Sequence, residues 1–156
     1  EIDALTSISN RGSGERRAEK LINSGVKGMF CLLDVDKFKS INDSFGHTVG
    51  DKALIEIADC LRRSFTGSDV VMRLGGDEFA VIAAATDEEA VKAAVETLRR
   101  LCAEWDAKEE YPVSIAVGYA MQAGRTMTAD ELFMEADAAM YRNKAEIKKA
   151  VGGIIR

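Results

Sequence analysis

Two short acidic segments of this 156-residue chain carry the residue type that binds divalent cations. Asp34 and Asp36 end an otherwise apolar run. Asp77 and Glu78 directly follow two glycines. A carboxylate inside an apolar run costs free energy unless it is paired or binds a metal. If Asp34 and Asp77 converge, their oxygens and a main-chain carbonyl form a partial shell for Mg²⁺, which normally leaves positions open for phosphate oxygens.

Both acidic segments also have a structural interpretation. Asp36 either begins the following helix as its N-cap or continues the strand, in which case the two-residue period puts it on the same face as Asp34. These alternatives remain open, whereas the position of Asp34 inside the apolar run favours a functional role. The Gly-Gly-Asp segment ending at Asp77 is by itself an ordinary hairpin turn. The second acid, Glu78, favours more than a turn, since a turn needs only one polar residue.

The polar connection that follows the first strand is a third candidate region. It supplies cations, an amide, the single histidine and a carboxylate: Lys37, Lys39, Asn42, His47 and Asp51. A carboxylate can accept two N–H donors from the edge of guanine, so Asn42 or Asp51 could bind a purine base. Asp51 could equally belong to a capping-box variant that begins at Thr48. For His47, a local hydrogen bond and a catalytic role are both open.

Composition limits the class of ligand. With 47% hydrophobic and 30% charged residues, one proline and 13 glycines, the chain has the composition of one folded domain. The 21 basic and 26 acidic residues give a net charge of −5, which argues against nucleic-acid polymers and anionic membranes as partners. A phosphate-bearing ligand must therefore be bound by locally arranged cations, a metal ion or backbone amides.

Cysteine usage and hydropathy indicate the compartment. Cys31, Cys60 and Cys102 are an odd, widely spaced set that predicts neither a disulfide framework nor a structural zinc site. A reducing, cytoplasmic compartment is the simplest interpretation. The sequence has no apolar stretch of about 20 residues and no signal peptide. Because it starts at Glu1, we expect a single domain, residues 1–156, excised from a longer protein.

The elements that must position these residues alternate between helix and strand. Hydrophobic periodicity and turn residues predict the order αβαββαβαβ. The expected helices are Glu15–Ser24 ending at Gly25, Val49–Phe65, and two that open at the capping boxes Thr86–Glu89 and Thr128–Glu131; the expected strands are Met29–Leu33, Val70–Leu74, Glu78–Ile82, Pro112–Ala120 and an edge strand Gly152–Arg156. One hairpin between helical crossovers predicts an α/β (α+β) fold with a ferredoxin-like βαββαβ core, its sheet mixed but mostly antiparallel.

The motifs together resemble the GGDEF family of diguanylate cyclase domains over nearly the whole chain. Four segments in matching order and spacing carry the resemblance: Asp3–Thr6 with Asn10 and Arg11, Leu33–Asp51, Arg73–Phe79 and Ala136–Lys144. The resemblance implies a nucleotide-cyclase-like fold. It also implies Mg²⁺-dependent condensation of two GTP molecules into cyclic di-GMP, with Mn²⁺ as an alternative cation. Each protomer would hold one GTP, so the active form would be a homodimer, in a parent protein with an upstream sensory domain.

The resemblance also implies roles for individual residues. Asp34, Asp77 and the Val35 carbonyl would bind the metal, and Asp77 would accept the proton of the 3′-hydroxyl. Glu78 would support the same site, and Lys39 would stabilise charge on the phosphates. The residues expected to bind substrate are Lys37, Phe38, Asn42, His47, Asp51, Gly75, Gly76, Lys144 and Lys148, of which Asn42, His47 and Asp51 would hold the nucleoside and Lys144 the terminal phosphates.

The sequence departs from the family pattern at four places. The arginine of the product-binding Arg-x-x-Asp motif is replaced by Thr66 ahead of Asp69, which predicts weak or absent product inhibition. Ser7 stands where the early motif has glycine, a serine is missing from the stretch 116–118, and Lys148 replaces an arginine. Lysine cannot make the planar fork of arginine on a phosphate. Arg62 and Arg63 are expected on a solvated helix face.

Two other functions compete with an active cyclase. A noncatalytic domain of the same family would bind GTP and signal to a neighbouring domain without turnover. A ferredoxin-like interaction module without a ligand would leave the carboxylate of Asp34 in its apolar strand unexplained.

Overall fold

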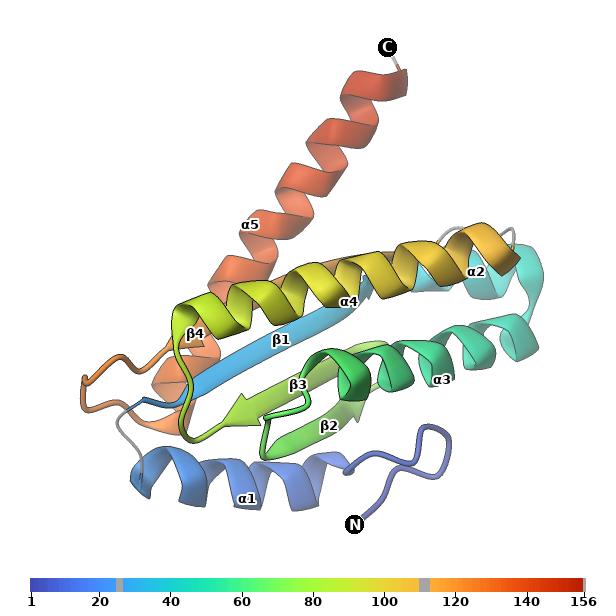
Figure 1. Ribbon diagram of the computed structural model, residues 1–156. Coiled ribbons are helices and arrows are strands. Elements are labelled where there is room, and N and C mark those ends of the chain that lie inside the picture. Colours follow the sequence, from blue (N-terminus) through green and yellow to red (C-terminus); the bar gives the residue numbers. More distant parts are fainter. Residues whose placement is uncertain (25–26, 110–112, 156) are drawn as a thin grey trace.

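One four-stranded sheet organises the chain, and helices pack on both of its faces (Figure 1). The computed structural model describes residues 1–24, 27–109 and 113–155. Along the chain these form α1 (Arg11–Ser24), β1 (Met29–Asp36), α2 (Phe38–Phe45), α3 (His47–Ser64), β2 (Val70–Gly75), β3 (Glu78–Ala83), α4 (Glu88–Glu109), β4 (Ser114–Met121) and α5 (Ala129–Ile155).

Strand order confirms the ferredoxin-like prediction. The order is β2-β3-β1-β4, and the strand pairs β1–β3, β1–β4 and β2–β3 are all antiparallel. β1 and β3 are therefore central and covered on both faces, which is why they read as continuous apolar runs. β2 and β4 form the edges of the described sheet.

The two faces of β1 belong to different hydrophobic clusters. Met29, Leu33 and Val35 point to the cluster built with α3 and α4. Phe30 and Leu32 point to the opposite cluster, which contains side chains of α1 and α5. The two-residue period of the strand therefore turns Asp34 toward the α1 and α5 side.

The connection after β1 differs from the prediction. β1 continues through Asp36, so the N-cap interpretation of Asp36 is wrong, and Lys37 precedes α2 in the left-handed conformation with φ 56°. The polar stretch contains the extra helix α2, whose buried face is so short that Ile41 is its single fully buried residue. α3 then begins at His47, and no side chain caps it, so the predicted capping-box variant is absent.

The other helix termini confirm one capping box and correct two predictions. Thr128 N–H donates to Glu131 Oε1 at 2.9 Å, and Glu131 N–H donates to Thr128 Oγ1 at 3.1 Å. Before α4 the cap is Asp87, whose Oδ1 accepts from the N–H of Ala90.

The edge strand expected after residue 151 is wrong, because α5 stays helical to Ile155 and projects beyond the sheet (Figure 1). Two glycines in a helix cost only about 1 kcal/mol each. Predictions at Gly25, Pro112 and Arg156 lie outside the described residues.

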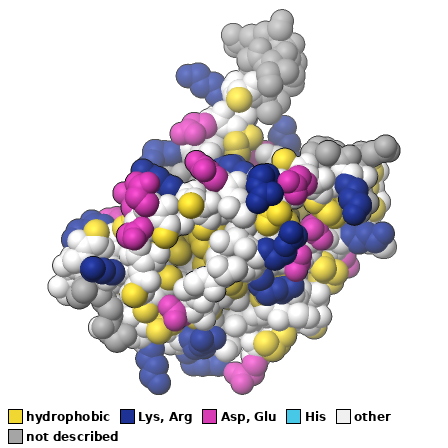
Figure 2. Space-filling view, viewed as in Figure 1, with side chains coloured by type: hydrophobic (Ala, Val, Ile, Leu, Met, Phe, Trp, Pro, Cys, Tyr) yellow, Lys and Arg dark blue, Asp and Glu magenta, His cyan; other side chains and the backbone are white. Residues whose placement is uncertain are grey.

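Among its described residues, the face of the molecule shown in Figure 2 carries no large field of one charge sign. On this face, acidic and basic side chains are interspersed. In the part of the chain that the structure describes, no helix is long and apolar enough to cross a membrane. All three cysteines are buried free thiols.

Candidate functional site

The end of β1 and the turn between β2 and β3 bring the two predicted acids together. Asp34 pairs in register with Glu78 of β3. One residue later, Val35 N–H donates to the Asp77 carbonyl at 3.1 Å. The hairpin turn is therefore attached directly to the strand that carries Asp34, which is only 7% exposed.

Glycine at the turn has a conformational reason. β2 ends at Gly75 and β3 begins at Glu78, so two residues connect the strands. Gly75 has φ 150° and Gly76 has φ 52°, and side chains rarely adopt these positive values. A Cβ at either position would meet no atom within 4 Å, so the glycines leave the backbone of the turn open to a ligand.

The two oxygens of Asp34 have different surroundings. Oδ2 forms an ion pair with Nζ of Lys144 on α5. Oδ1 is buried and has no hydrogen-bond partner. A buried carboxylate oxygen without a partner carries the full cost of its lost hydration, so it favours the arrival of a cation or donor.

The charges of the site shift one another's pKa. Burial, followed by the neighbouring carboxylate of Asp34, raises the pKa of Asp77 to about 6. The hydrogen bond with Asp34 raises the pKa of Lys144, although burial opposes the change. Two carboxylates and one lysine therefore form a cluster in which one positive charge does not balance two negative charges.

This cluster fits the expected magnesium ion. Asp34 Oδ1 and the Asp77 carboxylate provide two oxygens. The N–H and C=O of one strand residue point to the same side, so the Val35 carbonyl lies on the side of its N–H, toward the turn. Within the described residues, no group of three or more His, Cys, Asp or Glu side chains forms a fuller metal site. Such a partial oxygen shell suits Mg²⁺ with phosphate or water completing the coordination.

A second unpaired polar atom lies where the nucleoside was expected. Asn42 Oδ1 is buried and has no hydrogen-bond partner. It lies against Gly50 of α3, where an added Cβ would overlap it, and Phe38 packs beside the same glycine. The extra helix α2 therefore presents Asn42 to the first turns of α3, which also carry Asp51.

The remaining predicted residues lie outside this contact network. Among the described residues, no hydrogen bond or ion pair joins the acids to the other predicted substrate ligands. Those that are exposed side chains are Lys37, Lys39, His47, Asp51, Glu78 and Lys148. The roles predicted for them stay predictions.

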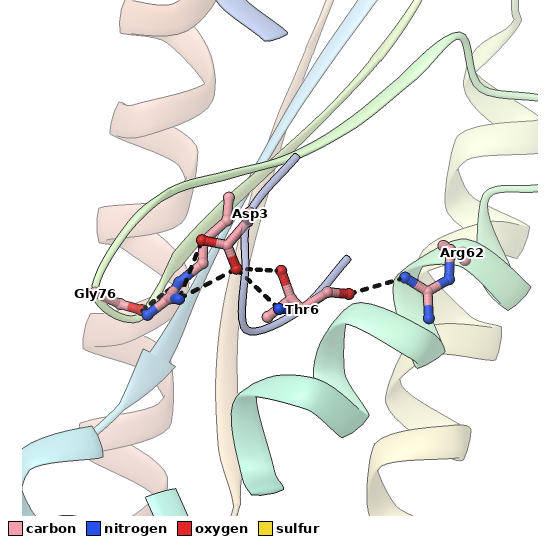
Figure 3. A network of polar contacts seen from close by, with 5 residues as sticks. Asp3, Thr6, Arg62 and Gly76 are labelled. Carbon is pink, nitrogen blue, oxygen red and sulfur yellow. Dashed lines mark hydrogen bonds and ion pairs between the residues drawn. The ribbon is translucent and has the colours of Figure 1, made fainter. Parts of the chain in front are cut away.

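The side chain that supports the turn was not predicted from the sequence. Arg73 donates from Nε and Nη2 to the Gly76 carbonyl at 3.0 and 2.7 Å, and from Nη1 to the Asp3 carboxylate at 3.3 Å (Figure 3). Arg73 and Asp3 both lie in motifs that carry the family resemblance, but 70 positions separate them. Burial opposes the shift, yet hydrogen bonds from Thr6 and Arg73 lower the pKa of Asp3. Arg62 continues the network to the Thr6 carbonyl, and its side chain stays exposed on α3, as expected.

Two sequence departures have structural consequences. Ser7 replaces glycine at a position with φ 63°, where an L-residue is strained. In the product-binding motif, where Thr66 replaces the arginine, the remaining Asp69 carboxylate accepts from the Ala84 N–H at 2.7 Å, so part of its hydrogen-bonding capacity is occupied within the fold.

A cavity also lies away from these residues. It measures about 390 Å³ and lies between α1 and the start of α5, over Phe30, Met72 and Leu74. It contains none of the predicted site residues. This cavity is therefore separate from the candidate site at Asp34.

Comparison with known proteins connects this geometry to a family. The family model described as "Diguanylate cyclase, GGDEF domain" matches residues 1–150. The chain is 38% identical over 149 residues to "Diguanylate cyclase DgcP" of Pseudomonas aeruginosa, covering 91% of this chain and 22% of that protein. It is 35% identical over 148 residues to "Bifunctional diguanylate cyclase/cyclic di-GMP phosphodiesterase MucR" of the same organism, again covering 91% and 22%.

Solved structures agree in fold. A "sensory box/GGDEF family protein" from Caulobacter crescentus matches with a TM-score of 0.75 and 34% identity, covering 94% of this chain and 99% of that one. The chain spans about a fifth of the length of the two curated relatives.

Proposed function

This chain belongs to the GGDEF family of diguanylate cyclase domains, and we propose that it condenses two GTP molecules into cyclic di-GMP, releasing two pyrophosphates. The observation that carries the proposal is the convergence of Asp34 and Asp77 at the glycine turn, with one orphaned carboxylate oxygen and Lys144 beside it. In an interaction module without a ligand, a buried unpaired carboxylate oxygen would cost free energy and gain no partner.

Asp77 is the proposed base. The 3′-oxygen of one GTP forms a bond to the α-phosphorus of the other, and the bond from that phosphorus to the oxygen bridging to the β-phosphate breaks. Pyrophosphate leaves, and the 3′-hydroxyl proton passes to the Asp77 carboxylate. A carboxyl whose pKa is about 6 is a stronger base than an ordinary aspartate and is still mostly ionised at neutral pH.

Cations complete the proposed centre. Asp34, Asp77 and the Val35 carbonyl would hold Mg²⁺, or Mn²⁺ as an alternative, and the ion would supply charge neutralisation on the phosphates when bound. Lys144, already drawn to the site by Asp34, is the ligand for the terminal phosphates. The other residues proposed around the nucleotide are Lys37, Phe38, Lys39, Glu78 and Lys148, with Gly75 and Gly76 allowing the phosphates close to the turn.

The base is proposed to bind between α2 and α3. Asn42 offers an unpaired buried oxygen there, and a carboxylate such as Asp51 can accept from both N–H groups on one edge of guanine. His47 precedes this position on the same helix.

The proposed assembly is a homodimer with facing sites, because each 3′-hydroxyl must reach the α-phosphate held by the other protomer. We take residues 1–156 as one catalytic domain of a longer cytoplasmic signalling protein with an upstream sensory domain. The chain spans only about a fifth of the length of its two curated relatives, which supports this proposal.

A turnover assay tests the proposal. The chain is incubated with GTP and Mg²⁺, and cyclic di-GMP and pyrophosphate are quantified by chromatography. We expect product from the unaltered chain and none from Asp77→Ala, with Glu96→Gln on the exposed face of α4 as a matched control that retains activity. GTP binding without product would instead favour a regulatory GTP-binding domain, and no nucleotide binding would favour an interaction module.

A further inference from the structure

Three elements meet at an amide side chain that has no role in the mechanism above. Asn143 Oδ1 accepts from the Val117 N–H of β4 at 2.8 Å and from Arg99 Nη2 of α4 at 2.8 Å. Arg99 Nη1 also donates to the Ile115 carbonyl of β4 at 3.3 Å. These bonds form a closed loop that ties α4 and α5 to one side of β4.

β4 needs these partners because it is an edge strand that pairs only with β1 in the described sheet. Its outer N–H and C=O groups would otherwise be left to solvent or to another strand. α5 also touches β4 directly, since a Cβ at Gly118 would overlap the backbone of Met140 and Ala136. The backbone contact sets the distance between helix and strand, and Asn143 supplies a second attachment about one helical turn later.

The second attachment lies beside the proposed active centre. Lys144 follows Asn143 in the chain and pairs with Asp34. Asp34 lies opposite Ala116 in the register, and Val117 is the next residue of β4. The hydrogen bond that Val117 donates to Asn143 and the ion pair of Lys144 with Asp34 are therefore at neighbouring register positions of the sheet. Rotation of α5 about its axis would break the first and withdraw the second.

We propose that Asn143, held by Arg99, is a positioning residue that sets the ammonium group of Lys144 for the terminal phosphates of GTP. This inference rests on the proposed function. A lysine side chain has four rotatable bonds and no geometric preference of its own for a phosphate. The direction in which it leaves the helix is therefore decided by how α5 is attached, and Asn143 is the attachment nearest to it in the chain.

Two nucleotides separate this role from a purely structural one. GMP lacks the terminal phosphates, whereas α,β-methylene-GTP retains them and cannot release pyrophosphate. In titration calorimetry with Mg²⁺, we expect Asn143→Ala to lower the affinity for α,β-methylene-GTP about fivefold, which is the effect of one lost hydrogen bond. GMP affinity stays unchanged. Arg99→Met likewise lowers the affinity for α,β-methylene-GTP and leaves the affinity for GMP unchanged. Arg100→Met, which loses only an exposed ion pair with Glu104, changes neither affinity.

A double substitution tests whether the effect passes through Lys144. In a Lys144→Met background, Asn143→Ala adds no further loss of affinity for α,β-methylene-GTP. In turnover assays, Asn143→Ala raises KM for GTP more than it lowers kcat. Equal weakening of GMP and the analogue, or an undiminished effect of Asn143→Ala without Lys144, overturns the inference while leaving the proposed function intact. Failure of the unaltered chain to bind the analogue at all refutes the proposed function, and the inference with it.

Discussion

Replacing the proposed catalytic acid should make the metal-free fold more stable. Asp77 faces Asp34 across the turn, and burial together with that second carboxylate raises the pKa of Asp77 to about 6 from 3.8. An acid whose pKa is higher in the folded state than in the unfolded state binds its proton more tightly when folded. Ionised Asp77 therefore destabilises the fold, and Asp77→Asn removes that cost.

The size of the effect follows from the pKa. A rise from 3.8 to about 6 corresponds to about 3 kcal/mol. Since Asp77 is only partly buried, solvent screening reduces this to about 1 to 2 kcal/mol. For a domain of this length, Tm should rise by about 2 to 6 °C at pH 8. The gain begins as pH rises above 3.8, reaches about half its size near pH 5, and is complete above about 6.

Thermal unfolding followed by circular dichroism, in EDTA and at several pH values, measures this gain. Glu96→Gln is the control, because it removes an exposed carboxylate far from any turn. Adding Mg²⁺ at pH 8 should raise Tm of the unaltered protein and have a smaller effect on Asp77→Asn, since one proposed ligand is gone. A gain in Tm that is the same at pH 4 and pH 8, or a loss at pH 8, would refute the reasoning.

Two further predictions concern the supports of the site. Asp3→Asn leaves the Arg73 guanidinium, whose side chain is 16% exposed, without its carboxylate and should cost about 1 to 3 kcal/mol in urea unfolding. Because the folded pKa of Asp3 is lowered, the contribution of its carboxylate is present above pH 3.8 and is lost as pH falls below it, so the two proteins should converge in acid; a constant difference would contradict this. Gly50→Ala should displace the Asn42 amide and weaken guanine-nucleotide binding about fivefold or more, with little change in Tm because a side chain and not the backbone must move. Unchanged affinity would show that Asn42 does not contact the base.

The paired acids and their turn were predictable because the signals are local. A carboxylate in an apolar strand costs free energy wherever the strand lies in the fold, so the sequence alone identified Asp34 as a candidate metal ligand. Two glycines between apolar runs predicted the hairpin, and the reciprocal bonds between Thr128 and Glu131 span only three positions. Period and turn chemistry carry such information within a few residues.

Helix α2 and the tail were missed for a related reason. α2 buries little beyond Ile41, so its apolar stripe was too short to distinguish a helix from a polar connection. Beyond residue 151, the two glycines and the short apolar tail were interpreted as an edge strand, although the helix continues to Ile155. Both errors come from weak local preferences, which neighbouring structure overrides.

The sequence by itself determined the acids, the glycine turn and the strand order that brings them to one end of a sheet. Tertiary structure alone decided which side chains hold that end in place. Asp3 reaches Arg73 across 70 positions, and Arg99 reaches Asn143 across 44. Neither pair has a periodic or turn signal, because a hydrogen bond between distant elements depends on how helices and strands dock, and docking is set by the packing of the whole core.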